Sequence, residues 1–298
     1  MRSDGASITG AGGRLLAGAV VAVLVVGACG AGASPSAVSG PDRVKAAGTL
    51  VWCTDTWSPP FASTATGGNA EVGSEAVGLD IDIAAEVAKR LGVTSKISPT
   101  GFDVALSSLG SGACDLVISN MTSTVPGRAE KADFVDYLAT WTGFLVASGN
   151  PKAIRTVEDL AGKSVVVAPD DPLSAPVLQA ASADLVAAGK PAIEIVWTTE
   201  SAQKTEEETV GELVAGQVDA LAGDSAFNAY YVDKPPYAGA SEIGGPLLDP
   251  QPIGIAVRRD DAGMMDAVAA AIDAMYADGT MKAIIAKWGL TDAVELLQ

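Results

Sequence analysis

The feature that most constrains the fold is an alternation of strand-like and helix-like segments. In the first half, apolar runs at 49–54 and 115–119 and a further predicted strand at 95–98 alternate with helical patterns at 78–91 and 102–109. Apolar runs of this length are typical of buried strands, and apolar positions three and four residues apart are typical of helices. A strand–helix–strand–helix–strand order predicts a parallel sheet with crossover helices.

A second set of strands and helices follows in the other half of the chain. The predicted strands are 143–147, 164–168, 193–197, 217–222 and 254–257, and the predicted helices are 157–161, 173–188, 204–215, 224–231, 264–277 and 281–287. Two such sets, joined by two crossing segments, predict two lobes with a ligand site between them. We expect lobe 1 to comprise 47–142 and 252–298, and lobe 2 to comprise 143–251.

The stretch from Asp115 to Tyr137 combines a buried-strand pattern, a polar turn and one arginine. Residues 120–124 follow the strand, a Pro-Gly pair breaks the chain, and Arg128 comes next, before a predicted short helix at 129–133. The N–H groups of such a turn and a guanidinium can together hold a small anion such as a carboxylate. The alternative is a plain loop whose arginine pairs with a surface acid such as Glu130.

Composition and charge exclude several classes of function. The chain is 48% hydrophobic, which is enough for a large core, and its net charge is −17. Such an acidic protein would repel nucleic-acid phosphates. The sequence has no histidine, which removes Ser-His-Asp and Cys-His catalysis and His-ligated metals. We expect a monomer with no cofactor and no metal.

The N-terminal segment has the pattern of a bacterial lipoprotein signal. The apolar run Leu15–Ala28 is shorter than a membrane span needs and typical of a signal-peptide core. It ends in Val-Gly-Ala-Cys, which resembles a lipobox with Val26 in place of the usual leucine. We therefore predict a signal peptide at 1–28, lipid on Cys29, a flexible tether at 29–46 and a location outside the cytoplasm on the cell membrane. The alternative is a plain signal peptide that is cut nearby.

Two further cysteines are left. An exported protein can hold a disulfide. Cys53 lies inside a predicted strand and Cys114 just before one, so the two would lie at different heights in the sheet. We expect two small buried thiols rather than a bridge.

Eight motifs follow one another over residues 47–290. They are TD at 54–55 with PF at 60–61, GLDIDI at 78–83, the segment 109–115, the segment 119–128 with DF at 133–134, EDLAGK at 158–163, the segment 210–224, GIAV at 254–257, and DGT at 278–280 with KWGL at 287–290. In this order they resemble the family 3 extracellular solute-binding proteins of ABC importers, which mostly bind amino acids. The resemblance implies an α/β fold of the type II periplasmic-binding-protein kind. Its two parallel-sheet lobes are joined by a two-segment hinge and close on ligand.

The resemblance also implies roles for single residues. Arg128 would hold a ligand α-carboxylate, helped by the N–H and hydroxyl of Thr122, and Asp224 would take the α-ammonium. A zwitterion removed from water needs both of its charges paired. The alternative for Asp224 is a helix N-cap, a role that can coexist with ligand binding. The candidate ligand residues are Asp55, Trp57, Phe102, Asn120, Thr122, Arg128, Trp141, Asp171 and Asp224.

The chain departs from the family pattern in lobe 1. Thr122 and Arg128 lie six residues apart rather than five, so Ser123 could be the donor instead of Thr122. The aromatic residue of the first turn is Trp57, one position earlier than usual, and it could cover the ligand or belong to the core. Trp141, where relatives carry a small residue, could line the cleft or stiffen the hinge.

A further departure lies in lobe 2. The family offers Gly-Thr or Gly-Ser after the first strand of this lobe, whereas this chain has Ala-Pro-Asp-Asp-Pro at 168–172. Asp170 and Asp171 would repel a carboxylate, which favours a ligand with extra positive charge or with no carboxylate facing lobe 2. The alternative is a solvated acidic loop.

These observations predict a binding protein rather than an enzyme. It would capture an amino acid or a related small amine and deliver it to the permease subunits of an ABC importer. One alternative is a ligand-sensing receptor subunit. Another is a secreted enzyme similar to cyclohexadienyl dehydratase, with Asp55, Asp170 or Asp171 as the general acid.

Overall fold

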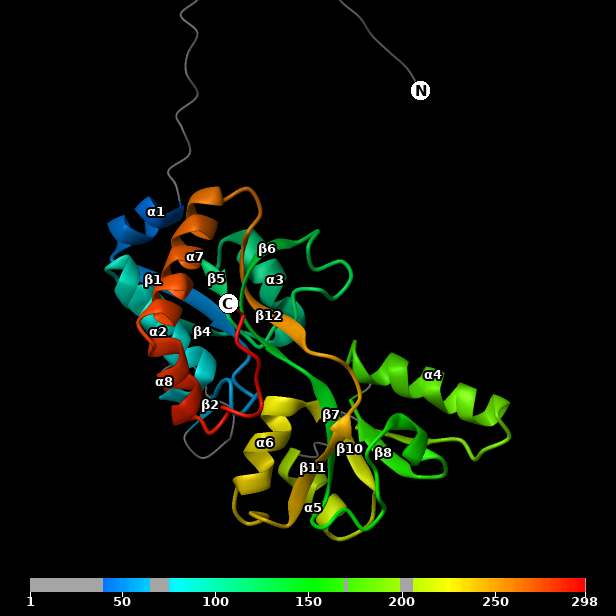
Figure 1. Cartoon of the computed structure of the whole chain (residues 1–298). Helices are drawn as coiled ribbons and strands as arrows, with labels where there is room; N and C mark the ends of the chain where they lie inside the picture. Colours follow the sequence, from blue (N-terminus) through cyan, green and yellow to red (C-terminus); the bar gives the residue numbers. More distant parts are fainter. Residues whose placement is uncertain (1–39, 65–74, 169–170, 199–205, 298) are drawn as a thin grey trace, which may run out of the picture. The chain divides into compact units, whose positions relative to one another are not determined.

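The structure is a computed structural model that describes residues 40–64, 75–168, 171–198 and 206–297. These residues belong to one unit, 38–298, which is built on two five-stranded sheets and one two-stranded sheet (Figure 1). The predicted signal peptide, Cys29 and Asp170 lie outside the described residues.

The first large sheet has the strand order β4-β1-β5-β12-β6. Its strands are β1 (Thr49–Thr54), β4 (Thr94–Pro99), β5 (Leu116–Val117), β6 (Ala132–Thr140) and β12 (Gln251–Arg258). β1 pairs in parallel with β4 and β5, whereas β12 runs antiparallel to both β5 and β6. The parallel unit predicted for the first half is confirmed, and two antiparallel strands extend it.

The second large sheet has the strand order β11-β7-β10-β8-β9. Its strands are β7 (Thr142–Ala147), β8 (Ser164–Val167), β9 (Glu194–Trp197), β10 (Ala220–Asp224) and β11 (Ser241–Pro246). β8, β9 and β10 are parallel, and β7 is antiparallel to β10 and β11. Both sheets are therefore mixed rather than purely parallel as predicted. The exact division into lobes stays a prediction.

Helices cover both faces of each large sheet. They are α1 (Gly40–Ala47), α2 (Leu79–Leu91), α3 (Phe102–Ser111), α4 (Ser174–Ala187), α5 (Glu206–Val214), α6 (Ser225–Asp233), α7 (Ala262–Ala277), α8 (Thr280–Lys287) and the 3₁₀ turn η1 (Val157–Leu160). The remaining strands, β2 (Ser63–Thr64) and β3 (Ala76–Val77), pair with each other. None of the helices in the described ranges has the length and apolarity that crossing a membrane would require.

Strand β1 shows how the first sheet separates two cores. Successive side chains of a strand point to opposite faces. Leu50 and Trp52 pack with α1, α2, α7 and α8, whereas Val51 and Cys53 pack under α3. The second sheet does the same, because Phe144 packs with α4 and the neighbouring Leu145 packs with α5 and α6.

One prediction about a single element is wrong, and two strands were not predicted. Residues 129–133 are not a helix, because Ala132 already begins β6, and neither β6 nor β11 is among the predicted strands. β6 pairs with β12, from Ala132 opposite Arg258 to Thr140 opposite Gln251. The partner strand lies far away in the sequence, so its contribution could not be seen in the local pattern.

The predicted tether is too long at its C-terminal end. Residues 40–46 belong to helix α1, and Val44 of this helix is buried in the core with α7. Asp42 lies in the first turn and Lys45 in the last, an arrangement that suits the helix dipole. The tether prediction therefore stays open only for residues before Gly40.

The expectation of two free thiols is wrong, because Cys53 and Cys114 form a disulfide. Their Cα atoms are 5.8 Å apart, within the range that a disulfide spans. Cys114 precedes β5, in the connection from α3, and packs on the same face of the sheet as Cys53. The two cysteines were expected at different heights along the strands, which argued against a bridge. Cys114 reaches Cys53 because the connection that carries it lies over the face of the sheet toward which Cys53 points.

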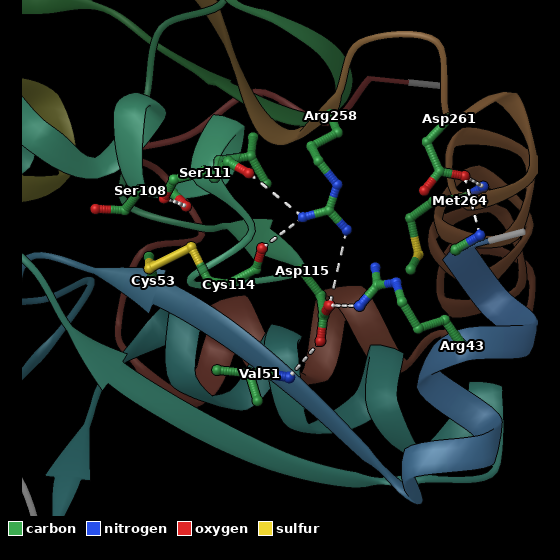
Figure 2. A network of polar contacts seen from close by, with 12 residues as sticks. Arg43, Val51, Cys53, Ser108, Ser111, Cys114, Asp115, Arg258, Asp261 and Met264 are labelled. Atoms are coloured by element: carbon green, nitrogen blue, oxygen red, sulfur yellow. Dashed lines mark hydrogen bonds and ion pairs between the residues drawn. A yellow bond between two sulfur atoms is a disulfide. The ribbon is translucent and has the colours of Figure 1, made fainter. Parts of the chain in front are cut away.

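A charged network holds the same end of β5 (Figure 2). The Asp115 carboxylate forms an ion pair with Arg43 of α1, lies 3.8 Å from Nη2 of Arg258, and accepts a hydrogen bond of 2.9 Å from the Val51 N–H. Arg258 also donates to the Cys114 carbonyl oxygen at 2.8 Å. The disulfide and this network together fix the start of the strand whose other end leads into the candidate site.

Candidate ligand-binding site

The polar turn after β5 is held against β12. The Ser123 N–H donates to the Pro252 carbonyl oxygen at 3.1 Å, and the Gly254 N–H donates to the Met121 carbonyl oxygen at 3.0 Å. Thr122, buried between them, bridges to Ile253. The sequence left either Thr122 or Ser123 as the donor to a ligand carboxylate. Because the Ser123 N–H already has a partner, Thr122 is the better candidate.

Arg128 is half-buried at the end of this turn. Its Nη1 donates to the Thr122 carbonyl oxygen at 2.6 Å, and the guanidinium carbon lies 5.3 Å from the centre of the Phe102 ring, a cation–π contact. Burial lowers the pKa of Arg128. Within the described ranges Arg128 forms no ion pair, so the predicted alternative, a pair with Glu130, is not found.

A cavity of about 610 Å³ adjoins the guanidinium. It lies between α3 and the turn, with Phe102, Leu106, Met121 and Val125 as its apolar lining and Arg128 among its polar groups. The two predicted residues Phe102 and Arg128 therefore line one space. The cavity combines an apolar wall with a cation, as ligand sites commonly do.

Asp224 ends β10 and caps α6. Its Oδ1 accepts hydrogen bonds from the Ala226 N–H at 2.8 Å and the Phe227 N–H at 3.4 Å, so the predicted N-cap is confirmed. Burial raises the pKa of Asp224, and hydrogen bonds from Thr140, from these N–H groups and from Asn120 oppose the increase. No cation of the described part of the chain pairs with this carboxylate.

Asn120 joins Asp224 to a second acid. Its backbone takes the left-handed conformation, with φ of 44°, which asparagine tolerates better than most residues. The Asn120 N–H donates to Oδ2 of Asp80 at 2.8 Å, and its side-chain amide donates to Asp224. The side-chain oxygen of Asn120 is buried and has no partner in the described part of the chain. It is a free acceptor beside a carboxylate.

Asp80 was not predicted as a site residue. It is completely buried near the start of α2, and Tyr137 Oη donates to its Oδ1 at 2.6 Å. Burial raises the pKa of Asp80 to about 7, against the two hydrogen bonds it accepts and with a contribution from the charge of Asp224. The sequence held a signal for it, because Asp80 lies on the helix face of Ile83, Ala84 and Val87, where an apolar residue is expected.

The first turn of the chain is attached to the same region. The Asp55 N–H donates to Ser119 Oγ at 3.0 Å, and Oδ1 of Asp55 accepts from the Trp57 N–H at 2.9 Å. The Trp57 side chain is 49% exposed, so the alternative that places it in the core is wrong. Its predicted contact with ligand stays a prediction.

Trp141 lies between β6 and β7, at the first crossing from one sheet to the other. Its N–H donates to Ser225 Oγ at 3.2 Å, and its carbonyl oxygen accepts from the Ser225 N–H at 2.8 Å. Ser225 Oγ in turn donates to the Ala293 carbonyl oxygen at 2.6 Å. The backbone of Trp141 thus helps to connect the crossing with α6 and the C-terminal segment.

Asp171 has a local structural role. Its carboxylate accepts from the N–H groups of Leu173 and Ser174, both at 2.8 Å, and from the Ser174 hydroxyl at 2.6 Å. It therefore stabilises the first turn of α4 rather than standing as a free charge in a solvated loop. No interaction links it to the other predicted site residues within the described ranges.

Hydrogen bonds and ring contacts bring the predicted residues into two groups. One contains Arg128, Thr122 and Phe102, with a cation that has no ion pair in the described ranges. The other contains Asp224 and Asn120, with a carboxylate that no cation of those ranges neutralises. An unpaired guanidinium and an unpaired carboxyl suit a small ligand that carries both charges.

Known proteins share this fold. Among solved structures, an ancestral arginine-binding protein bound to arginine is 32% identical, with a TM-score of 0.60 over 81% of this chain and 98% of that one. An ancestral amino acid-binding protein, a precursor of cyclohexadienyl dehydratase, is 30% identical, with a TM-score of 0.64 over 84% of this chain and 99% of that one. The predicted fold class is confirmed, and the fold is that of a type II periplasmic binding protein.

The sequence comparisons identify the family. Residues 50–291 match the bacterial extracellular solute-binding proteins, family 3. The L-cystine-binding protein TcyJ of Escherichia coli strain K12 is 28% identical over 255 residues, which are 83% of this chain and 85% of TcyJ. The chain belongs to the bacterial extracellular solute-binding proteins of family 3, as its motifs predicted.

Proposed function

We propose that this chain is the substrate-binding protein of an ABC importer and that it binds an amino acid as a zwitterion. The ligand carboxylate would lie on Arg128, with the N–H or hydroxyl of Thr122 as a second donor. The ligand ammonium would lie on Asp224, with the free side-chain oxygen of Asn120 as a second acceptor. Phe102 and Trp57 offer aromatic surface for the ligand.

The two uncompensated charges are the observation that carries this proposal. In the described part of the chain, the partners of Arg128 are a carbonyl oxygen and an aromatic ring, and those of Asp224 are neutral donors. Both groups are half-buried, and a charge that is partly removed from water without a counter-charge is destabilising. A zwitterionic ligand would supply the missing charge to both groups. The relatives named for binding cystine and arginine support an amino acid as the ligand.

The site would act by binding alone. The captured amino acid would pass to the permease subunits of an importer, while lipid on Cys29 keeps the protein at the outer face of the cytoplasmic membrane. This part of the proposal is supported by the lipobox-like sequence and by the family. Asp55 and Asp171 already accept hydrogen bonds from their own turns, which makes them poor candidates for the general acid of a dehydratase.

Calorimetry with a panel of amino acids and polyamines tests the proposal. A ligand at a hundred times its Kd should stabilise the protein by about 2.7 kcal/mol. Arg128→Gln removes a charged hydrogen bond to the ligand and should weaken binding by about 1.5–3 kcal/mol, or roughly 10- to 100-fold. Arg155→Gln, at an exposed arginine, is the control and should leave the affinity unchanged.

A matched pair of N-cap variants tests the ammonium site. Asp224→Asn keeps the cap of α6 but removes the charge, and Asp261→Asn makes the same change at the cap of α7. Only the first should weaken binding. Turnover of prephenate or arogenate would contradict the proposal, as would a folded protein that no amino acid stabilises.

A further inference from the structure

Asp80 is a buried carboxyl that the ligand roles above do not use. Its two oxygens accept hydrogen bonds from Tyr137 Oη, at 2.6 Å, and from the Asn120 N–H, at 2.8 Å. A carboxylate in such a position normally has a cation beside it. In the described ranges no lysine or arginine forms an ion pair with Asp80.

Among the residues that the structure describes, the groups that surround Asp80 offer no positive charge. Tyr137 faces it from β6, Asn120 from the turn after β5, and Asp224 from the end of β10. Tyr276 of α7 donates to the Tyr137 carbonyl oxygen and so belongs to the same neighbourhood. The nearest acid on α2 itself, Asp82, is neutralised by Lys287 of α8 and also accepts from the indole N–H of Trp288.

Asn120 connects Asp80 to the candidate ammonium site. Its backbone N–H binds Asp80 and its side-chain amide binds Asp224, so one residue touches both carboxyls. Repulsion between the two carboxylates contributes to the raised pKa of Asp80, after burial. Ionisation of one carboxyl therefore disfavours ionisation of the other, and their titrations are coupled.

Asp80 is completely buried and Asp224 is half-buried, and in the described ranges neither carboxyl has a cation beside it, so the pair holds a proton instead. Burial raises the pKa of both groups, that of Asp80 to about 7. Below about pH 7 the ligand-free pair therefore keeps a proton, chiefly on Asp80. An ammonium that arrives beside Asp224 supplies the positive charge that the proton supplied before, and the proton becomes free to leave.

We propose that a ligand ammonium replaces a proton on the Asp80–Asp224 pair, so that Asp80 sets the pH range in which the protein holds its ligand. This inference rests on the proposed function, because it needs the ammonium to bind at Asp224. No covalent bond to the ligand forms or breaks. One carboxyl O–H bond ionises, the proton passes to the solvent, and an ammonium N–H donates to the Asp224 carboxylate.

The exchange has a defined thermodynamic signature. Ligand binding that releases a proton becomes weaker as the pH falls, by up to tenfold per pH unit for one proton. Asp80 is thus a positioning residue that acts on the ligand through the charge of Asp224 without touching it. A purely structural Asp80 would leave the affinity independent of pH in this range.

Titration calorimetry of the purified protein with L-arginine, in two buffers that differ in ionisation enthalpy, counts the protons released. At about pH 6, where an α-amino group stays protonated, we expect release of up to about one proton, declining toward about pH 8. Asp80→Asn keeps the shape of the side chain and should abolish the release while arginine still binds. L-Cystine is the second probe if arginine gives no heat.

A second variant should shift the pH range of proton release instead of abolishing the release. Tyr137→Phe deletes the hydrogen bond that lowers the pKa of Asp80, so proton release should extend to higher pH. Tyr276→Phe removes a neighbouring hydroxyl that binds a carbonyl oxygen and should not move it. If Asp80→Asn fails to fold, Tyr137→Phe still decides the question.

The outcomes separate this inference from the proposed function. Binding without proton release at about pH 6, or equal release by the wild type and Asp80→Asn, overturns the inference and leaves the proposed function intact. A folded protein that binds no amino acid of the panel at any pH overturns both.

Discussion

Asp80 should make the stability of the ligand-free protein depend on pH. Its pKa is about 7 in the folded protein, against 3.8 for an unperturbed aspartate. Below both values the group is protonated in either state and contributes nothing. As the pH rises from about 4 to 7, the unfolded chain loses a proton that the folded protein keeps, so stability falls. Above about 7 the penalty is complete, at about 4 kcal/mol.

Urea unfolding at about pH 4.5 and about pH 7.5 checks this prediction for Asp80→Asn. The variant should gain stability relative to the wild type as the pH rises across the interval, because it has no carboxyl to ionise. Asp184→Asn, at an exposed position of α4, serves as the control and should follow the wild type. Parallel profiles for Asp80→Asn and the wild type would show that Asp80 ionises normally in the folded protein.

Single residues differ in how far the sequence could predict their roles. Arg128 and Asp224 lie in motifs with a known order, and the cap at Asp224 follows from its position before a helix. Asp80 had a visible signal, an acid on an apolar helix face. The link from Asp80 through Asn120 to Asp224 had none, because it depends on a left-handed residue that turns its N–H toward one carboxyl and its amide toward the other.

At the scale of elements, the disulfide should stabilise the first sheet. It joins β1 to the start of β5 across a separation of 61 residues. Closing a loop of this size in the unfolded chain removes entropy worth about 4 kcal/mol at 25 °C. Replacing both cysteines by alanine should lower the free energy of unfolding by about this amount, measured by urea denaturation.

The affinity for ligand provides the control for the cysteine variant. Asn120, Thr122 and Arg128 follow the opposite end of β5. The network of Asp115, Arg43 and Arg258 still holds the start of this strand. Binding should therefore survive the double substitution at temperatures where the protein stays folded. A large loss of affinity with unchanged stability would mean that the disulfide shapes the site directly.

The elements that the sequence predicted well carry their signal locally. Helix α2 is an example, with Ile83 and Val87 on its buried face and Gly92 at a φ of 77° as its C-cap. β6 and β11 lack such a signal. β6 is defined by its pairing with β12, a strand more than a hundred residues away. The two-sheet topology followed from the motifs, but the antiparallel strands could not be predicted without knowledge of these long-range pairs.

At the scale of the whole molecule, the two large sheets are connected by more than the chain crossings. Ser225 at the start of α6 contacts the backbone of Trp141 and, through its hydroxyl, the Ala293 carbonyl oxygen. Ala139 of β6 pairs with Glu295 of the C-terminal segment. Asp224 lies next to Ser225, so the proposed ammonium site is adjacent to these contacts. A ligand ammonium bound at Asp224 would therefore lie next to the Ser225 contacts that connect the two sheets.

The proposed place of the protein outside the cell membrane depends on Cys29. The apolar run before it should direct export, and the thiol should then receive a lipid. One acyl chain holds a protein to a membrane only weakly, so a stable anchor needs at least two. Growth with a fatty-acid analogue should label the wild-type protein and place it in the membrane fraction.

Two variants at the cleavage motif test this anchoring. Cys29→Ser should lose the label and leave the membrane fraction, while its affinity for ligand stays unchanged, because the residues from Gly40 onward form the folded unit that contains the candidate site. Val26→Leu restores the usual leading residue of a lipobox and should keep the label. If Cys29→Ser is still labelled, lipid is attached elsewhere. If the wild type is never labelled, the segment is a plain signal peptide.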